Sequence, residues 1–510
     1  MAIKYCSWTT GSDTTGNGSA SNPYKTITKA SQSLTGGDEV RVAKSPAPVN
    51  LTPTFSFTNG STTVTASSSV FVNAVSGGES DGSVRLGDFI KGGDGNWWEV
   101  SAYTSATQAT LYQKYSGSTQ SGVSSQKLLV TDTGAAANYD TQVQVVSSSG
   151  TSTSKLKISG GWNLSTETQD GETFFRQIHG TFDNRLGYGL YIDGKNYLQI
   201  EKLGFLRYSY GIYFDGTSTN NTLSSITCNS NSSYGIYFGG TSTNNTLSSI
   251  TCNSNSYGIC FNSASTNNTL SSITCNSNSY YGIRFGSSTT PPNGTTLSSI
   301  TCNNNTYGIY FNSSVADTDL GYITCNNNSQ YGINLGSFTN AKINNYSGTG
   351  NTSGDFQFGT ITYIGELPYL QIQHFKTLGD NRCYFQYGMT YRDTDNAKDE
   401  GGECLKFSPT SDTYYIRQGF YFAVKSGEEK TISAYIKKDS SFNGDVIGAL
   451  YFMGKNITGW TDFTPSTSGT YQQKSLVASA DEITEDGIVE LRIKARGTAG
   501  SAYVDDLSIE

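Results

Sequence analysis

Charged residues are scarce in this sequence. Asp, Glu, Lys and Arg make up 15% of its 510 residues, against about a quarter in ordinary globular proteins. The net charge is −8, and nucleic-acid binding needs clustered basic residues, so we expect no nucleic-acid partner. Disorder is also not expected, because 34 tyrosines and 24 phenylalanines can supply a core.

Histidines are also scarce, and long apolar segments are absent from the sequence. Only His179 and His374 are present and no CxxC pair accompanies the cysteines, so we expect no zinc site. No apolar run reaches the roughly 18 residues of a membrane span, so we expect no membrane insertion. The start, MAIKYCSWTTGSD, lacks the apolar region of a signal peptide. We therefore expect synthesis in the host cytoplasm, followed by retention there or release by another route, such as in a virus particle.

An internal repeat dominates the middle of the chain. The tripeptide Tyr-Gly-Ile, once Tyr-Gly-Leu, recurs every 22 to 26 residues from Tyr188 to Tyr331. The tetrapeptide Ile-Thr-Cys-Asn follows nearly the same period. One copy, YGIYFGGTSTNNTLSSITCNSNS, is rich in β-branched and aromatic residues with Gly and Asn at the breaks, which favours short strands and turns. We therefore predict an all-β protein whose repeats stack as coils of a parallel β-helix.

Strand alternation assigns the two faces of each coil. Ile236 and Phe238 should point inward and Tyr237 outward. The repeated Asn after each Cys favours a left-handed turn and bonding from coil to coil. Adjacent coils, about 4.8 Å apart, would allow disulfides within the cysteine column. Reduced cysteines that fill the core are the favoured alternative. The asparagines and cysteines are Asn229, Asn253, Asn276, Asn303 and Asn326, and Cys228, Cys252, Cys275, Cys302 and Cys325.

Four regions follow from the pattern. Residues 1–50 predict an N-terminal cap and first coil, with a short helix after Pro23. Residues 51–130, with alternating runs and Gly/Asp-rich turns, predict an inserted small β module. Residues 131–364 predict the β-helix. Residues 365–510 contain alternating strands and ordinary charge, which predicts an antiparallel β-sandwich.

Three stretches resemble known families. The repeats GIYF and LSSITCN resemble the right-handed parallel β-helix of the pectate-lyase-like superfamily. The segment GDFIKGGDGNWWEVSAYTSATQATLY resembles a small β module of bacteriophage virion proteins. The motifs KTISAYIKK and YVDDLSI resemble carbohydrate-binding jelly-roll modules. The combination resembles a phage tailspike or tail fibre. The resemblance implies a homotrimer on the virion surface that contacts other virion proteins and a host cell-surface polysaccharide. It also implies a structural calcium ion near Asp505 and Asp506, and we expect no other cofactor.

Catalytic groups are few. Enzymes of the β-helix superfamily often cleave polysaccharides, and hydrolases among them use paired carboxylates. The best pair is Asp193 and Asp215, which occupy equivalent positions in YIDG and YFDG. Asp-Gly is also an ordinary turn dipeptide. The densest titratable cluster, residues 167–179, also fits a structural ion network near the cap. We therefore favour a non-enzymatic role; an enzyme on this fold would be a polysaccharide hydrolase or lyase.

Sugar binding has more candidates. The outward position of the GIYF strand is often tyrosine, and aromatic faces in a hydroxyl-rich setting suit sugar rings. The same tyrosines could instead stabilise neighbouring strands or lie in a subunit interface. The candidates are Tyr191, Tyr213, Tyr237, Tyr310, Trp97, Trp98 and Trp460.

The sequence thus predicts a phage surface protein that attaches to host glycans, with the β-helix as a rigid scaffold. The first alternative is a polysaccharide depolymerase with the same fold. The second is a cellular adhesin or an ice-binding solenoid, since a threonine column follows the same strands. The host, the glycan and the place of attachment on the virion stay open.

Overall fold

The computed structural model describes residues 1–133, 142–177, 185–286, 292–312, 315–316, 318–335, 338–339, 342–358, 390–393, 404–407, 411–424, 426–452, 455–484 and 487–509. The chain forms two compact units, Met1–Ser313 and Ser314–Glu510, and each is described by itself. Over the described ranges, no helix has the length and apolarity needed to cross a membrane.

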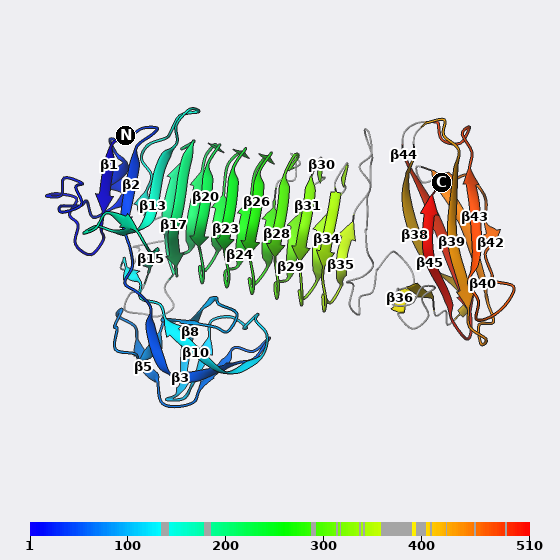
Figure 1. The fold of residues 1–510 in the computed structure, drawn as a ribbon, viewed down its shortest axis with the longest axis horizontal. Helices are drawn as coiled ribbons and strands as arrows, with labels where there is room; N and C mark the ends of the chain where they lie inside the picture. The colour runs from blue at the N-terminus through cyan, green and yellow to red at the C-terminus, as the bar shows by residue number, and fades with distance from the viewer. Residues whose placement is uncertain are drawn as a thin grey trace. The chain divides into compact units, whose positions relative to one another are not determined.

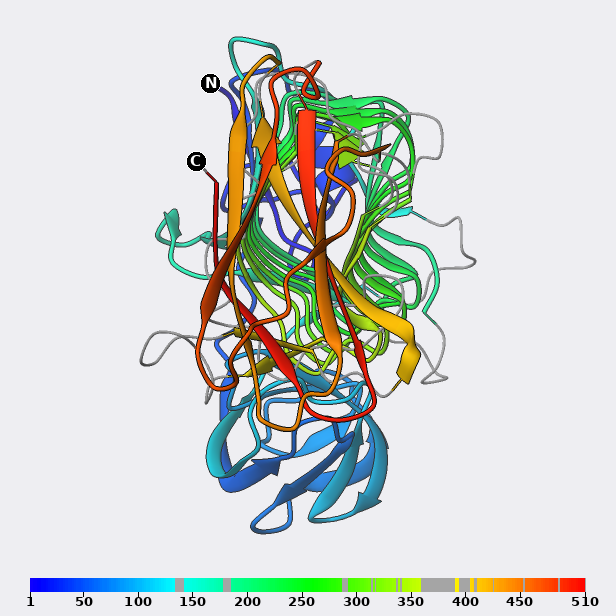
Figure 2. The ribbon, with the colours of Figure 1, turned by 90° about the vertical axis from the view of Figure 1, so that its right-hand side faces the viewer.

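The first unit contains a parallel β-helix, as predicted (Figure 1). Each coil contributes one strand to each of two long sheets, and some coils add a short third strand. Every copy is in register with the next: Ile212 lies opposite Ile236, and Ile236 opposite Ile259. Figure 2 looks along the stack, so that successive coils nearly superpose.

The strands of these sheets follow in a fixed order. The first sheet runs β1 (Ile3–Cys6), β2 (Glu39–Ala43), β13 (Leu156–Asn163), β17 (Leu198–Leu206), β20 (Thr222–Thr227), β23 (Thr246–Thr251), β26 (Thr269–Thr274) and β28 (Thr296–Thr301). The second runs β12 (Gln142–Val145), β16 (Tyr188–Asp193), β18 (Tyr210–Asp215), β21 (Tyr234–Phe238), β24 (Tyr257–Phe261), β27 (Tyr281–Phe285) and β29 (Tyr307–Phe311). The third comprises β19 (Ser218–Thr219), β22 (Ser242–Thr243) and β25 (Ser265–Thr266).

The coil interior is built from columns of identical residues. The phenylalanine rings stack almost parallel, with 4.5 Å between the centroids of Phe214 and Phe238. The cysteines are free and buried, as favoured above. Because identical side chains lie one above another, the side chains of each coil pack closely against those of the next coil.

Asparagines join the coils at three corners. The predicted column is confirmed as a bonded ladder, since the Asn253 backbone N–H donates to Asn229 Oδ1 at 2.8 Å. The residue with positive φ in that turn is the following serine, for example Ser230 at 57°, rather than the asparagine. Two further ladders begin at Asn231 and Asn221, which donate from N–H to Asn255 and Asn245 at 2.8 and 2.9 Å. These buried amides satisfy the backbone groups of turns that form no sheet.

A short helix and an early strand close the N-terminal end. Helix α1 (Ile27–Ser31) has Thr26 as its N-cap, and the Thr26 hydroxyl accepts from the Lys29 N–H. The helix begins four residues later than Pro23, because the Asp13 carboxylate first accepts from the N–H groups of Lys25 and Thr26. Ile27 and Ala30 are buried against the coils.

The inserted segment folds into a closed barrel. Its strands follow the order β10 (Gln120–Lys127), β3 (Val49–Phe57), β4 (Thr63–Ala66), β9 (Gln108–Leu111), β8 (Trp97–Ser105) and β7 (Phe89–Lys91). Strands β5 (Phe71–Val75) and β6 (Val84–Leu86) pair beside it. Phe55, Phe57, Trp98 and Tyr115 fill its core. The chain then returns to the coils through β11 (Thr131–Asp132), β14 (Thr168–Gln169) and β15 (Thr173–Arg176).

The second unit begins with parallel strand pairs of the repeat type. They are β30 (Val315–Ala316) with β33 (Phe338–Thr339), β31 (Asp319–Thr324) with β34 (Lys342–Ser347), and β32 (Tyr331–Leu335) with β35 (Gly354–Phe358).

The predicted antiparallel sandwich follows. One sheet has the order β36 (Thr390–Asp393), β37 (Cys404–Phe407), β45 (Ala502–Ile509), β39 (Lys430–Lys438) and β43 (Gln472–Ala478). The other has β38 (Ser411–Val424), β44 (Gly487–Gly497), β40 (Asp445–Phe452) and β41 (Lys455–Asn456), with β42 (Thr461–Asp462) on β40. Ile432, Ile436, Leu491 and Val446 from both sheets share one core.

Candidate functional site

Two columns of side chains form an aromatic surface on the second sheet of the β-helix, which we call the tyrosine face. Every tyrosine in these columns is half-buried. The first column is Tyr188, Tyr210, Tyr234, Tyr257, Tyr281 and Tyr307, and the second is Tyr191, Tyr213, Tyr237, Cys260, Arg284 and Tyr310. The sequence predicted the second column as a candidate. The first was noticed only as a repeat marker, since strict alternation does not place both on one side.

The glycine and isoleucine between the two tyrosines bring both rings to the same surface. Both intervening residues are buried, so the strand departs there from in-out alternation. A Cβ on Gly235 would lie 2.6 Å from the Gly258 carbonyl oxygen and 2.9 Å from the Cys252 Cβ. The cysteine column therefore requires the glycine column. The repeats contained this signal, since Gly and Cys recur with one period.

The rings of the tyrosine face contact one another in both directions. Along the stack, the centroids of Tyr234 and Tyr257 are 4.7 Å apart and nearly parallel. Across it, the centroids of Tyr234 and Tyr237 are 4.5 Å apart and tilted by 48°. Such contacts fix the ring orientations, so the surface is ordered before any ligand arrives.

Burial raises the pKa of six tyrosines of this surface, so their hydroxyls stay protonated at neutral pH; they are Tyr191, Tyr213, Tyr234, Tyr237, Tyr257 and Tyr281. Burial raises the pKa of Tyr237 to about 12. Burial, aided by the neighbouring Asp215, also raises the pKa of Tyr191, whose hydroxyl donates to Asp215 Oδ2 at 2.8 Å. The tyrosine face thus offers neutral hydroxyl groups beside apolar ring surfaces, the pairing that sugar rings require.

The two candidate carboxylates lie where the sequence placed them. Asp193 on β16 is directly opposite Asp215 on β18. Asp193 is exposed and Asp215 half-buried. The Gly216 N–H donates to Asp215 Oδ1 at 2.8 Å. Tyr191 and Gly216 therefore hold one carboxylate of the pair in place at the edge of the tyrosine face, and the other stays accessible.

The three tryptophan candidates differ in accessibility. Trp98 is 1% exposed in the barrel core, and its Nε1–H donates to Asp94 Oδ1 at 3.1 Å, so its ring cannot stack on a sugar. Trp97 is half-buried, with Lys91 Nζ 5.6 Å from its ring centroid. Trp460 in the sandwich is 36% exposed, and Lys494 Nζ lies 3.7 Å from its ring centroid. Tyr451 packs against the same ring, with 6.0 Å between the two ring centroids.

The proposed calcium position is only partly described. Asp505 lies on β45 opposite Tyr435 on β39, and Asp506 follows on the same strand. Their side chains lie outside the described part of the structure, so the calcium ion stays a prediction. Among the residues that are described, no three His, Cys, Asp or Glu side chains come together as a metal site.

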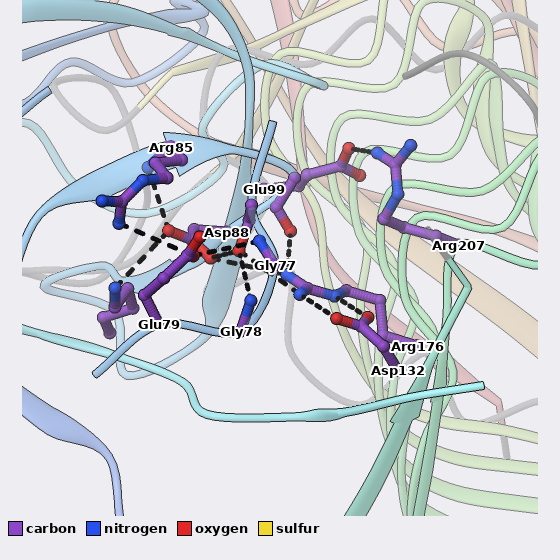
Figure 3. A network of polar contacts seen from close by, with 12 residues as sticks. Gly77, Gly78, Glu79, Arg85, Asp88, Glu99, Asp132, Arg176 and Arg207 are labelled. Atoms are coloured by element: carbon purple, nitrogen blue, oxygen red, sulfur yellow. Dashed lines mark hydrogen bonds and ion pairs between the residues drawn. The ribbon is translucent and has the colours of Figure 1, made fainter. Parts of the chain in front are cut away.

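A buried ion network joins the barrel to the β-helix (Figure 3). Glu99 on barrel strand β8 pairs with Arg207, which follows β17, and with Arg185 at 2.8 Å. The exposed side-chain fractions are 0% for Glu99, 1% for Arg207 and 4% for Arg185. Two guanidinium groups thus meet one carboxylate out of contact with water.

The second half of the network centres on Arg176 at the end of β15. Its Nε lies 2.7 Å from Asp132 Oδ1, and its Nη1 lies 3.4 Å from Asp88 Oδ1. Figure 3 shows the guanidinium reaching between these carboxylates. The Lys127 Nζ, also buried, is 3.7 Å from Asp88 Oδ2. Because every carboxylate already faces a cation, the cluster fixes the barrel in place. The sequence placed Arg176 in an ion network with the acidic residues of 167–179, whereas its partners Asp132 and Asp88 lie 44 and 88 residues away along the chain.

Comparisons with known proteins give matches of limited extent. The family model described as periplasmic copper-binding protein (NosD) matches residues 164–353, less than half of the chain. No curated protein matches the chain significantly. No copper site is apparent in the described ranges, because the stacked cysteines are sealed in the core and no suitable ligand cluster is found there.

The solved structures that match this chain include a pectate lyase, a phage tailspike and a carbohydrate-binding module. The pectate lyase is 10% identical, with 72% of this chain and 79% of that chain covered and a TM-score of 0.36. Tailspike protein 2 of a bacteriophage of Escherichia coli O157:H7 is 11% identical. The match covers 74% of this chain and 70% of the tailspike chain, with a TM-score of 0.30. A family 16 carbohydrate-binding module is 16% identical. The match covers 24% of this chain and 84% of the module, with a TM-score of 0.19. At these identities and TM-scores, the likenesses say nothing about activity.

Proposed function

We propose that this chain is a phage surface protein that binds a host glycan on its tyrosine face. One observation carries the proposal: a half-exposed, ordered array of tyrosine rings with protonated hydroxyls runs along the β-helix. Sugar rings bind through stacking of their C–H faces on aromatic rings, with hydroxyl groups at the rim. A polysaccharide is long and repetitive, and a column of like residues offers it successive equivalent contacts.

The virion assignment is a separate part of the proposal. It draws on the resemblance of the repeat, the inserted module and the C-terminal motifs to tailspikes and tail fibres. Under this assignment the protein is a homotrimer and contacts other virion proteins. Detection of the chain in purified particles, and a trimeric mass by light scattering, are the expected results. Absence from particles would instead favour the cellular adhesin or ice-binding alternative.

Glycan binding is tested by ring removal. The full chain would be applied to a panel of purified capsular polysaccharides and lipopolysaccharide O-chains, and affinities measured for those that bind. Tyr213→Ala and Tyr237→Ala should each weaken binding roughly 2- to 10-fold, given about 0.5–1.5 kcal/mol for an aromatic contact. Tyr103→Ala is the matched control, because Tyr103 is 36% exposed on the barrel. Equal affinities of all variants, or no binding to any polysaccharide, would refute the proposal.

A depolymerase is the second candidate function, and the pairing of Asp193 with Asp215 favours it. A retaining glycosidase needs carboxyl groups about 5–5.5 Å apart, a spacing within reach of directly opposed residues on adjacent strands about 4.8 Å apart. The expected result for an enzyme is release of reducing ends from a bound polysaccharide, abolished in Asp215→Asn. Binding without release of reducing ends or unsaturated sugars would exclude this candidate.

A further inference from the structure

The tyrosine face carries one positive charge. Its second column is interrupted at two adjacent coils, where Cys260 and Arg284 stand in place of tyrosine. Between positions 211 and 313 the only charged residues are Asp215 and Arg284. Arg284 therefore departs from both the repeat and the composition of the segment that contains it.

Neighbouring rings and a thiol hold the guanidinium at the surface. Its Cζ lies 6.0 Å from the ring centroid of Tyr257 and 5.9 Å from that of Tyr281. Its Nη1 is 3.7 Å from Cys260 Sγ. It also lies over Gly286, where a Cβ would come within 2.8 Å of the Arg284 Cζ. Cys260 is smaller than tyrosine and leaves space for the guanidinium beside the rings of Tyr257 and Tyr281. Gly286 has no Cβ, so the guanidinium can lie close to the backbone there.

This guanidinium has no anionic partner in the described structure. The ion pairs found among described residues do not include Arg284, which is half-buried. The one acidic residue of the segment, Asp215, is three coils away, since β21 and β24 lie between its strand β18 and the Arg284 strand β27. Three coils span about 14 Å, which exceeds the screening length of about 8 Å at physiological ionic strength.

We propose that Arg284 binds the carboxylate of one acidic sugar in a glycan whose neighbouring sugars are neutral. This inference rests on glycan binding by the tyrosine face. A planar guanidinium presents two parallel N–H groups that match a carboxylate, and the flanking tyrosines exclude water from the pair. Asp193 and Asp215 lie at the far end of the same face and repel a second carboxylate. The face thus selects a heteropolysaccharide with widely spaced acidic sugars over a continuous polyuronate.

The test compares each bound acidic polysaccharide with its carboxyl-reduced form. Capsular polysaccharides with one uronic acid per repeat are the probes, and polygalacturonate is the densely charged comparator. For the unaltered protein we expect the native form to bind roughly 10- to 100-fold more tightly than the reduced form, the effect of one hydrogen-bonded charge. Polygalacturonate should bind more weakly than a polysaccharide with one uronic acid per repeat. Asp215→Asn should reduce this difference in affinity.

Arg284→Gln should remove the preference for the native over the carboxyl-reduced polysaccharide, because it weakens binding of the native form alone. Arg284→Lys should retain part of this preference. Lys25→Gln is the matched control, because Lys25 lies 4.8 Å from the Trp8 ring centroid on the N-terminal cap; it should change nothing. Unchanged thermal unfolding of the variants would show that folding is intact. Equal binding of native and reduced forms, or a preference that survives Arg284→Gln, would overturn the inference and leave glycan binding standing. Binding to no polysaccharide would instead defeat the proposed function itself.

Discussion

The β-helix coils and the junction between barrel and coils are stabilised in opposite ways. From 211 to 313 the chain contains two charged residues, and its coils are joined by asparagine ladders, ring stacks and apolar columns. At the junction, Glu99, Arg176 and Arg207 are buried as ions. The difference shows that charge is concentrated where two non-repeating surfaces must fit. Between identical coils, neutral amides suffice, and the outer surface of the second sheet is formed mainly by tyrosine rings.

The largest effect should come from the junction. Glu99→Gln removes the carboxylate that both Arg207 and Arg185 contact, and breaking a buried ion pair costs about 3–5 kcal/mol of unfolding free energy. Denaturant unfolding, monitored by intrinsic fluorescence, measures this loss of unfolding free energy.

Asp170→Asn is the control for this change, because the Asp170–Lys44 pair is exposed. Its unfolding midpoint should match that of the unaltered protein. A Glu99→Gln variant as stable as this control would show that the junction does not depend on its charges.

A second, smaller effect should come from a single ladder amide. The Asn255 Oδ1 accepts from the Asn231 N–H at 2.8 Å, and its Nδ2 donates to the Cys228 carbonyl at 3.0 Å. Asn255→Ala leaves both buried groups unsatisfied, and each costs about 1–3 kcal/mol. The same denaturant measurement should show a loss of about 2–6 kcal/mol. Asn262→Ala, at an exposed position, should have little effect; similar losses in both variants would contradict the ladder's role.

The smallest effect concerns alkaline pH and the tyrosine face. The pKa of Tyr237 is about 12 in the folded chain, against about 10 in an unfolded one. The unfolded state therefore loses this proton first as pH rises. The contribution of Tyr237 is fully present below pH 10 and disappears between pH 10 and about 12. Tyr237→Phe should reduce the pH dependence of unfolding in that window, as seen in denaturant midpoints at pH 9 and 11.5. An unchanged dependence would contradict the assigned pKa.

Much of the fold could be predicted because the repeat states the same local preferences many times. Inward Ile236 and Phe238, the cysteine column and the Asn229 ladder all followed from period and alternation. The same reasoning missed the first tyrosine column, because Gly235 and Ile236 both face the core and break the alternation. It also missed the two additional asparagine ladders.

The junction was harder to predict for a different reason. Glu99 and Arg207 are 108 residues apart, and neither lies in a repeated pattern that would indicate its partner. The closed barrel was predicted only as a small β module, since strand pairing across loops leaves no periodic signal. Trp98 looked like a sugar-binding residue because its burial depends on that closure.

The most direct test of the central claim is hydroxyl-radical footprinting of the chain with a polysaccharide that it binds, read out by mass spectrometry. We predict protection of Tyr213, Tyr237, Tyr281 and Tyr310 on the tyrosine face, with Tyr103 on the barrel and Trp460 in the sandwich labelled as in the free protein. Protection confined to Trp460, with unchanged labelling of the four tyrosines, would contradict the assignment of glycan binding to the β-helix.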